Sequence, residues 1–195
     1  MYALLDLANA NDIDPILHVI TDGRDTPPES SRGFADKLTA YQQDKKVTVA
    51  SVCGRYYTMD RDNRWERTQL GYDVIAKHEG KTAVSLQSAL EQAHADGVTD
   101  EFILPVAIDC DRDVTVQPGD TLIFYNFRAD RMRQIVPPFM FAEFDGFARD
   151  FVEDVAIVTM TNYVDTFTAD IAFPETEIKN VLAEVVSKAG LTQFH

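Results

Sequence analysis

Cysteine is scarce in this sequence, with only Cys53 and Cys110 among 195 residues. Two cysteines so far apart argue against a disulfide framework, and neither has a second cysteine close enough to indicate a zinc site. We therefore expect a reduced, cytoplasmic setting. No apolar run approaches the ~18 residues of a membrane span, and no basic and apolar leader opens the chain. A hydrophobic content of 45% is ordinary for a soluble globular protein.

Positive charge is also in short supply, because 32 acidic residues outnumber 18 basic ones and leave a net charge of −14. Such a balance argues against a nucleic-acid partner, whose phosphates would be repelled. Two short stretches nevertheless concentrate arginines: Arg55, Arg61, Arg64 and Arg67, and then Arg128, Arg131 and Arg133. This placement favours a local pocket for a small anion. The alternative is that these arginines pair with neighbouring acids on helix faces.

Apolar runs alternate with helical patterns along the whole chain. Strands are predicted over residues 15–21, 46–55, 102–108, 121–126 and 154–160. Helices are predicted over 1–8, from Pro27 onward, over 61–79 ending at Gly80, over 84–95, from near Ala129 to a break at Pro137-Pro138, and over 177–188. The alternation favours the α/β class: a largely parallel sheet with helices on both faces. No linker divides the chain, so we predict a single domain over residues 1–195. Its first residues resemble the middle of an amphipathic helix.

The stretch "DGRDTPPE", residues 22–29, joins the first predicted strand to the first long helix. Thr26 and Glu29 have the spacing of a capping box, and Pro27 suits the first position of a helix. Arg24 and Asp25 are therefore expected in a loop just before a helix N-terminus, where α/β proteins place anionic ligands. The competing interpretation is an ordinary junction in which Arg24 and Asp25 pair with each other.

Arginines also follow two other predicted strands. Arg55 ends the second strand, and Arg128 and Arg131 follow the strand "TLIFYN". Loops after parallel strands share one edge of a sheet, so these groups can converge, and guanidinium groups bind carboxylate and phosphate oxygens in bidentate pairs. Asp25, held ionised among arginines, is a plausible proton acceptor from a substrate hydroxyl.

Other candidate residues are weaker. Residues 109–113 imitate the start of a calcium loop, but Val114 stands where such a loop needs glycine and Asp120 where it needs glutamate. His18 is predicted to be a core histidine, whereas His78 and His94 are predicted to be exposed. His195 is terminal. The sequence offers no nucleophile elbow, Gly-rich phosphate loop or histidine pair with metal-ligand spacing, so it resembles half of an active site.

Three longer motifs resemble a known family. "HVITDGRDTPPESS", "VCGRYYTMDRDNRWER" and "IFYNFRADRMRQI" are similar to the motifs of cofactor-independent (2,3-bisphosphoglycerate-independent) phosphoglycerate mutases, and "VTMTNY" and "FPETEIKNVLAEVVSKAGLTQFH" resemble the segments that follow in the same order. The resemblance covers almost the whole chain. It implies an isomerase of glycolysis and gluconeogenesis that interconverts 3- and 2-phosphoglycerate through a phosphoserine, with two metal ions, usually Mn2+.

The resemblance further implies that this chain is only the substrate-binding domain, which is inserted into an alkaline-phosphatase-like domain of the same polypeptide. The serine, the metal ligands, a histidine in "GGVHSH" and a lysine belong to the missing parts, so no metal is expected to bind here. Carried over by motif, the substrate-binding residues are Arg24, Asp25, Arg55, Arg61, Arg128 and Arg131. Asp25 is in addition the implied acid and base for the substrate hydroxyls.

Two functions remain open at this point. The first is a domain of a mutase, whose isolated form is expected to be inactive. The second is a free-standing module that binds phosphorylated carboxylic acids without catalysis. Both use the same arginines, and the way the chain begins inside a predicted helix favours the first.

Overall fold

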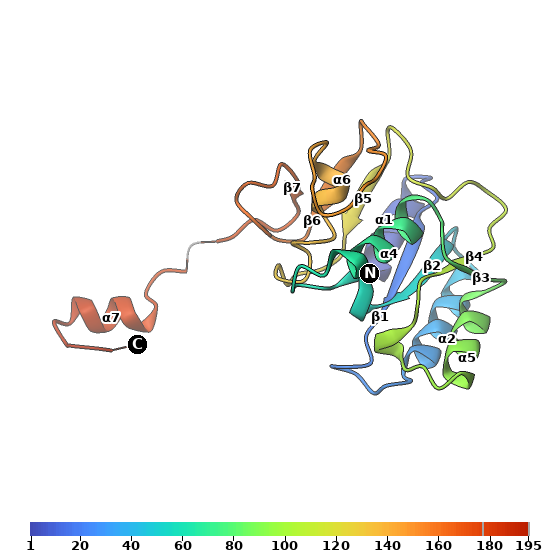
Figure 1. Cartoon of the computed structure of the whole chain (residues 1–195). Helices are drawn as coiled ribbons and strands as arrows, with labels where there is room; N and C mark the ends of the chain where they lie inside the picture. The colour runs from blue at the N-terminus through green and yellow to red at the C-terminus, as the bar shows by residue number, and fades with distance from the viewer. Residues whose placement is uncertain (177, 195) are drawn as a thin grey trace.

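The computed structural model describes residues 1–176 and 178–194, which form the alternating elements shown in Figure 1. In chain order they are α1 (Tyr2–Ala10), β1 (Ile16–Thr21), α2 (Ser31–Gln42), β2 (Thr48–Gly54), α3 (Arg55–Thr58), α4 (Trp65–Ala76), β3 (Lys81–Ala83), α5 (Leu86–Ala95), the 3-10 helix η1 (Asp100–Phe102), β4 (Val106–Ile108), β5 (Thr121–Phe124), α6 (Pro137–Met140), β6 (Ala156–Thr159), β7 (Asp170–Ile171) and α7 (Leu182–Lys188). No helix in the described part of the chain combines the length and apolar character needed to cross a bilayer.

The strands form two sheets. The first has the order β1-β2-β4-β3 and the second the order β5-β6-β7. All neighbouring strands are parallel except β2 and β4, which pair antiparallel. The predicted α/β class with a largely parallel arrangement in a single domain is confirmed. The strands are divided between two sheets, however, where the sequence pattern predicted one.

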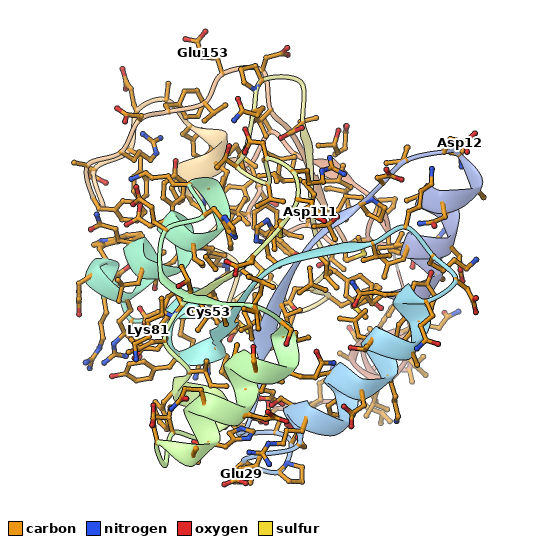
Figure 2. All side chains as sticks on the ribbon, turned by 90° about the vertical axis from the view of Figure 1, so that its right-hand side faces the viewer. Asp12, Glu29, Cys53, Lys81, Asp111 and Glu153 are labelled. Carbon is orange, nitrogen blue, oxygen red and sulfur yellow. The ribbon has the colours of Figure 1, made fainter. Side chains whose placement is uncertain are left out.

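Helices cover both faces of the first sheet, as predicted. Side chains along β4 alternate between two apolar clusters, because successive residues of a strand point to opposite faces. Val106 and Ile108 pack with Leu38 of α2 and Leu90 of α5, whereas the intervening Ala107 packs in the cluster that contains α4. Figure 2 shows α2 and α5 side by side over their face, with Glu29 near the start of α2.

The first helix after β1 begins later than predicted. The capping box expected from Thr26 and Glu29 is wrong, because Thr26 Oγ1 instead accepts a hydrogen bond from Gly23 N at 3.2 Å. The hydroxyl thus closes a turn within the loop, and α2 starts only at Ser31.

The proline pair has the opposite effect from the one predicted. Residues 129–136 are mainly turns, and Pro137-Pro138 begin the short helix α6 instead of ending one. Their missing N–H groups cost little there, because the first N–H groups of a helix have no intrahelical partner.

Several other boundaries differ from the pattern. The predicted helix over 61–79 extends only from Trp65 to Ala76 and ends before Gly80. The strand predicted over 102–108 is confined to β4, because η1 and Pro105 precede it. Strands β3 and β7 have three and two residues and were not predicted. The last helix, α7, begins at Leu182, and Glu177, its predicted start, lies outside the described residues.

Two of the three histidine predictions are wrong, and His18, predicted to be a core residue, is half-buried in β1. His18 lies in the first sheet with Nδ1 2.8 Å from Ser51 Oγ. His78 is half-buried, with Nε2 3.0 Å and 3.1 Å from two backbone carbonyl oxygens, and the His94 side chain is only 2% exposed. Both were predicted to be exposed because their sequence neighbours are polar. His195 lies outside the described residues.

Burial and the nearby His78 lower the pKa of His18 to about 4, from 6.5 in an unfolded chain. The unfolded chain therefore binds a proton that the folded chain excludes between these pH values, so the free energy of unfolding should fall as the pH drops from about 6.5 to about 4. The contribution of His18 is on the order of 3 kcal/mol. Urea unfolding of the wild type and of His18→Gln at about pH 7 and pH 4.5 measures it. The variant should lose less stability on acidification, and equal losses would contradict this prediction.

Candidate functional site: an arginine-lined pocket

The loops that follow β1 and β2 lie against the same short segment, η1. A Cβ added to Gly23, which has φ +64°, would lie 2.6 Å from Glu101 N, and a Cβ on Gly54 would collide with Glu101 O. No real side chain fits at such distances, so both loops contact η1 through their backbones. The loop after β1 (residues 22–30, here called the DGRD loop) and the start of α3 are thereby brought together.

Arg55 is the fixed centre of this arrangement. Its side chain is only 9% exposed, and Nη1 donates to both Asp22 Oδ1 and Asp25 Oδ2, the latter at 2.8 Å. Burial by itself lowers the pKa of Arg55, but the hydrogen bonds to Asp25 and Asp22 outweigh it and raise that pKa. Arg55 therefore stays charged while it holds the DGRD loop.

The remaining groups of the DGRD loop point outward. Arg24 is 59% exposed and makes one long ion pair with Glu101 at 3.4 Å, while the Asp25 side chain is 72% exposed. Arg24 and Asp25 thus pair with different residues and not with each other. Asp22, which the sequence analysis did not select, accepts from the backbone N–H groups of Arg24 and Asp25 at 3.4 and 3.3 Å, and so organises the loop from within.

The loop after β5 reaches the same place from the second sheet. Gln134, 4% exposed, donates to Asp60 Oδ2 and accepts from the N–H of Asn63, which fixes this loop to the segment before α4. Arg131 Nη1 donates to Met59 O at 3.0 Å. The predicted convergence is therefore found for Arg24, Arg55 and Arg131, although the loops that carry them follow strands of two different sheets.

Asp130 stands between the outer two arginines. Arg61 Nη1 lies 2.6 Å from Asp130 Oδ2, and Arg128 Nε lies 2.7 Å from Oδ1. Burial alone raises the pKa of Asp130, but the hydrogen bonds from Arg61 and Arg128 outweigh it and lower that pKa. The sequence left open an alternative in which these arginines pair with neighbouring acids. Arg61 and Arg128 do so, and the acid that they share, Asp130, lies in the same motif as Arg128.

Arg131 differs from Arg24, Arg55, Arg61 and Arg128 in having no carboxylate partner among the described residues. In the described part of the chain no acidic oxygen lies within 4 Å of it, and its buried Nε has no hydrogen-bond acceptor. Burial lowers the pKa of Arg131, and the positive charges of Arg61, Arg55 and Arg24 lower it further. The guanidinium is thus held in a field of like charge with one donor unused, which is the environment that a bound anion would stabilise.

Beside these groups lies a pocket of about 250 Å³, and the predicted site residues Asp25, Arg61 and Arg128 are not among its lining residues. It is lined by Arg24, Arg55 and Arg131 and by Tyr56, Asp60, Asp62, Arg67, Glu101 and Phe102. The aromatic wall was missed in the sequence. Arg67 lies over the ring of Tyr56, with Cζ 3.8 Å from the centroid, and Phe102 packs against the same ring. In the sequence, the two consecutive tyrosines after Arg55 were the only indication of these aromatic contacts.

The carboxylates of the described residues do not form a metal site. No group of three or more His, Cys, Asp or Glu side chains in residues 1–176 and 178–194 is placed to hold an ion. The acids near the arginines are instead engaged in ion pairs, as Asp22 and Asp130 show. The pair of divalent ions that the family resemblance implies does not fit these residues.

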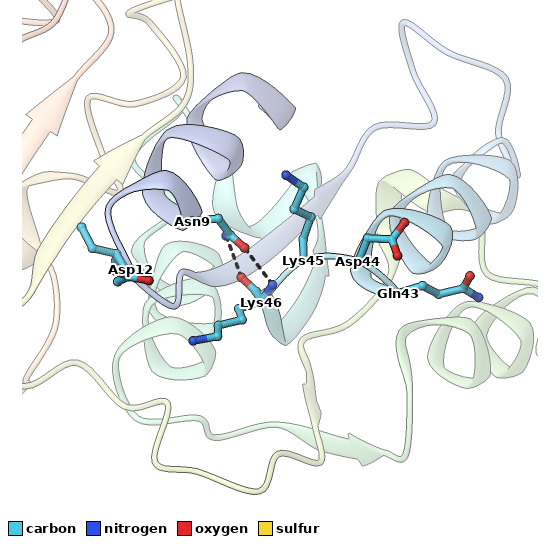
Figure 3. A pocket seen from close by; sticks show the side chains of 7 residues that line it. Asn9, Asp12, Gln43, Asp44, Lys45 and Lys46 are labelled. Atoms are coloured by element: carbon cyan, nitrogen blue, oxygen red, sulfur yellow. Dashed lines mark hydrogen bonds between the residues drawn. The ribbon is translucent and has the colours of Figure 1, made fainter.

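A larger surface hollow of about 380 Å³ lies elsewhere, beside α1. Figure 3 shows that Asn9 contacts the backbone of Lys46 twice: Nδ2 donates to Lys46 O, and Oδ1 accepts from Lys46 N, at 2.9 and 2.8 Å. Lys45 and Lys46 pair with Asp6 and Asp14. The polar groups of this hollow therefore join α1 to the loop before β2. Because they are paired with other protein groups, we do not regard the hollow as the candidate functional site.

Comparisons with known proteins agree with the motifs. The family model described as BPG-independent PGAM N-terminus (iPGM_N) matches residues 1–165. The chain is 41% identical to a 2,3-bisphosphoglycerate-independent phosphoglycerate mutase 2 of Methanosarcina barkeri and 39% identical to the corresponding mutase of Trichodesmium erythraeum. Both alignments use all of this chain but only 40% and 36% of the relatives.

A solved structure gives the same result. The chain superposes on a crystal structure of Leishmania mexicana phosphoglycerate mutase obtained at low cobalt concentration, with a TM-score of 0.83 and 26% identity. The match covers 97% of this chain and 37% of that one. This chain therefore belongs to the family of 2,3-bisphosphoglycerate-independent phosphoglycerate mutases and corresponds to their N-terminal family region.

Proposed function

We propose that this chain is the substrate-binding part of a mutase that interconverts 3- and 2-phosphoglycerate in the cytoplasm, in glycolysis and gluconeogenesis. The phosphoserine and the divalent ions, manganese in the usual case, belong to a phosphatase-like domain of the same polypeptide. The observation that carries the proposal is Arg131, a half-buried guanidinium in the wall of an arginine-lined pocket, for which the described part of the chain supplies no carboxylate partner. A substrate that bears a phosphate and a carboxylate can supply anionic oxygens to Arg131 and to the other arginines of this pocket.

The arginines divide into two roles in this proposal. Arg55 and Arg131 are held by Asp22, Asp25 and a backbone carbonyl, so they present fixed donors that lose little side-chain freedom on binding. Arg24, Arg61 and Arg128 are 44–69% exposed and closer to solvent. These can exchange their long or shared ion pairs for contacts with the substrate.

Asp25 is the group proposed to move protons. One of its oxygens accepts from Arg55, and the side chain is otherwise largely exposed. A carboxylate fixed in this way can accept a proton from a hydroxyl of the glycerate and return it later. The other aspartate of the DGRD loop, Asp22, is less free, because it is occupied by Arg55 and by the loop backbone.

The decisive test of the function is an assay of the complete polypeptide. It should interconvert the two phosphoglycerates without added 2,3-bisphosphoglycerate. The 195-residue chain alone should show no mutase or phosphatase activity in a preparation free of contaminating enzyme. A chain that binds phosphorylated acids but belongs to a complete polypeptide without mutase activity would favour the non-catalytic module instead.

Binding by the 195-residue chain should depend on Arg131. Charge-assisted hydrogen bonds contribute roughly 1.5–3 kcal/mol each, so Arg131→Gln should weaken 3-phosphoglycerate binding about tenfold or more. NMR titration of the wild type, of Arg131→Gln and of Arg112→Gln measures this. Arg112 is exposed in a different loop and serves as the matched loss of one positive charge. Equal weakening in the two variants would show that only net charge matters.

In the complete enzyme, Asp25→Asn should lower kcat by about 10²–10⁴-fold and raise KM much less, because the amide keeps the shape but cannot take a proton. Arg55→Ala should raise KM more strongly, since it removes a donor to the substrate and releases Asp22 and Asp25. Steady-state kinetics of both variants separates the roles. Near-normal kcat in Asp25→Asn would leave Asp25 only the task of holding Arg55.

A further inference from the structure

Asp100 is a buried acid that the proposed chemistry does not use. The residue is 1% exposed and begins η1. Its backbone N–H donates to Pro28 O at 2.8 Å, and its carbonyl oxygen accepts from Thr21 Oγ1 at 2.6 Å. Thr21 directly precedes the DGRD loop and Pro28 is near its end, so the backbone of one residue holds both ends of this loop.

The side chain of Asp100 continues the same connection into α2 and α5. Oδ2 accepts from Ser31 N at 2.8 Å, and Oδ1 accepts from Ser31 Oγ and lies 2.8 Å from His94 Nε2. Arg32 Nε donates to His94 Nδ1, so the ring proton is on Nε2 and is donated to Asp100. Three donors therefore converge on one buried carboxylate, and only a group with two acceptor oxygens satisfies them all.

The same segment also touches the groups that carry the proposed chemistry. Glu101 pairs with Arg24, and the backbone of Gly23 lies directly against Asp100 Cβ, which would be 2.8 Å from an added Cβ. A shift of Asp100 would therefore move the loop that carries Arg24 and Asp25. Misplacement of reacting groups by about 1 Å can cost on the order of 100-fold in rate.

From these contacts we propose that Asp100 is a positioning residue for the reaction: its buried carboxylate, joined to Ser31 and to the His94–Arg32 pair, fixes the DGRD loop and thereby Asp25. The proposal rests on the mutase function proposed above. Asp100 is not proposed to bind the substrate as the arginines do, because its carboxylate oxygens already accept hydrogen bonds from protein donors.

The test compares two variants of the complete enzyme that both lose stability. Asp100→Asn keeps the size of the side chain but turns an NH₂ group toward one of the converging donors. Val49→Ala removes buried apolar atoms from the cluster that contains Leu38 and Leu90, at the far end of β2 from Gly54. Asp100→Asn should lower kcat about 10–100-fold, raise KM less, and speed hydrogen exchange in peptides that span residues 22–30. Val49→Ala should do none of these.

A double-mutant cycle decides whether Asp100 acts through Asp25. In an Asp25→Asn background, adding Asp100→Asn should change kcat by less than about threefold, because the group being positioned is already gone. The full factor in that background, or the same kcat and exchange in Asp100→Asn and Val49→Ala, would overturn the proposal. If Asp100→Asn does not fold, Ser31→Ala removes a single donor to the carboxylate and should show the same effects in weaker form.

A failure of the proposed mutase function can be distinguished from a failure of the positioning role of Asp100. A wild-type polypeptide that does not interconvert phosphoglycerates overturns the mutase assignment, and the exchange measurement then still decides whether Asp100 holds the loop. Faster exchange of residues 22–30 in Asp100→Asn than in Val49→Ala supports the positioning role. Equal exchange rejects it.

Discussion

The direct contact between η1 and two glycines is the constraint on which the rest of the site depends. Gly23 and Gly54 leave no room for a Cβ against Glu101, so the ends of β1 and β2 approach the same backbone segment. That approach places Arg24 beside Glu101 and allows Arg55 to reach Asp22 and Asp25. The positions of the charged groups therefore follow from backbone packing, and electrostatic attraction refines an arrangement that close contact has already determined.

The site can hold several arginines close together because carboxylates compensate most of their charges. This compensation is uneven. Arg55 has two carboxylate partners, Arg61 and Arg128 share Asp130, and Arg131 has none among the described residues. If carboxylates neutralised every arginine, an anion would gain little by binding. If they neutralised none, the loops that carry the arginines would repel each other. The observed distribution stabilises the loops and leaves Arg131, which lines the pocket, without a carboxylate partner among the described residues, so that a phosphate or carboxylate would complete the pairing.

Much of the fold could be predicted from the sequence, because apolar periodicity reports the elements with the largest buried faces. The strands at 16–21 and 48–54 and the helix at 86–95 were found in this way. Errors fell where local signals have two meanings. Pro137-Pro138 fit a helix start as well as a helix break, and the Thr26 hydroxyl can close a turn as well as cap a helix. Polar neighbours suggested an exposed His94, but its partners Asp100 and Arg32 come from other elements.

The sequence by itself determined the α/β class, the arginine-bearing loops and, through long motifs, the family to which the chain belongs. These features depend on residues that are neighbours in the sequence, so the sequence pattern is enough to reveal them. Only the tertiary structure decided that the strands form two sheets, that Asp22 and Asp130 hold the arginines, and that Arg131 lacks a carboxylate partner within the described residues. Asp100 is the clearest case, since it joins residues 69 and 79 positions away. Ion pairing and burial depend on distances between segments far apart in the chain, and the order of the residues does not specify those distances.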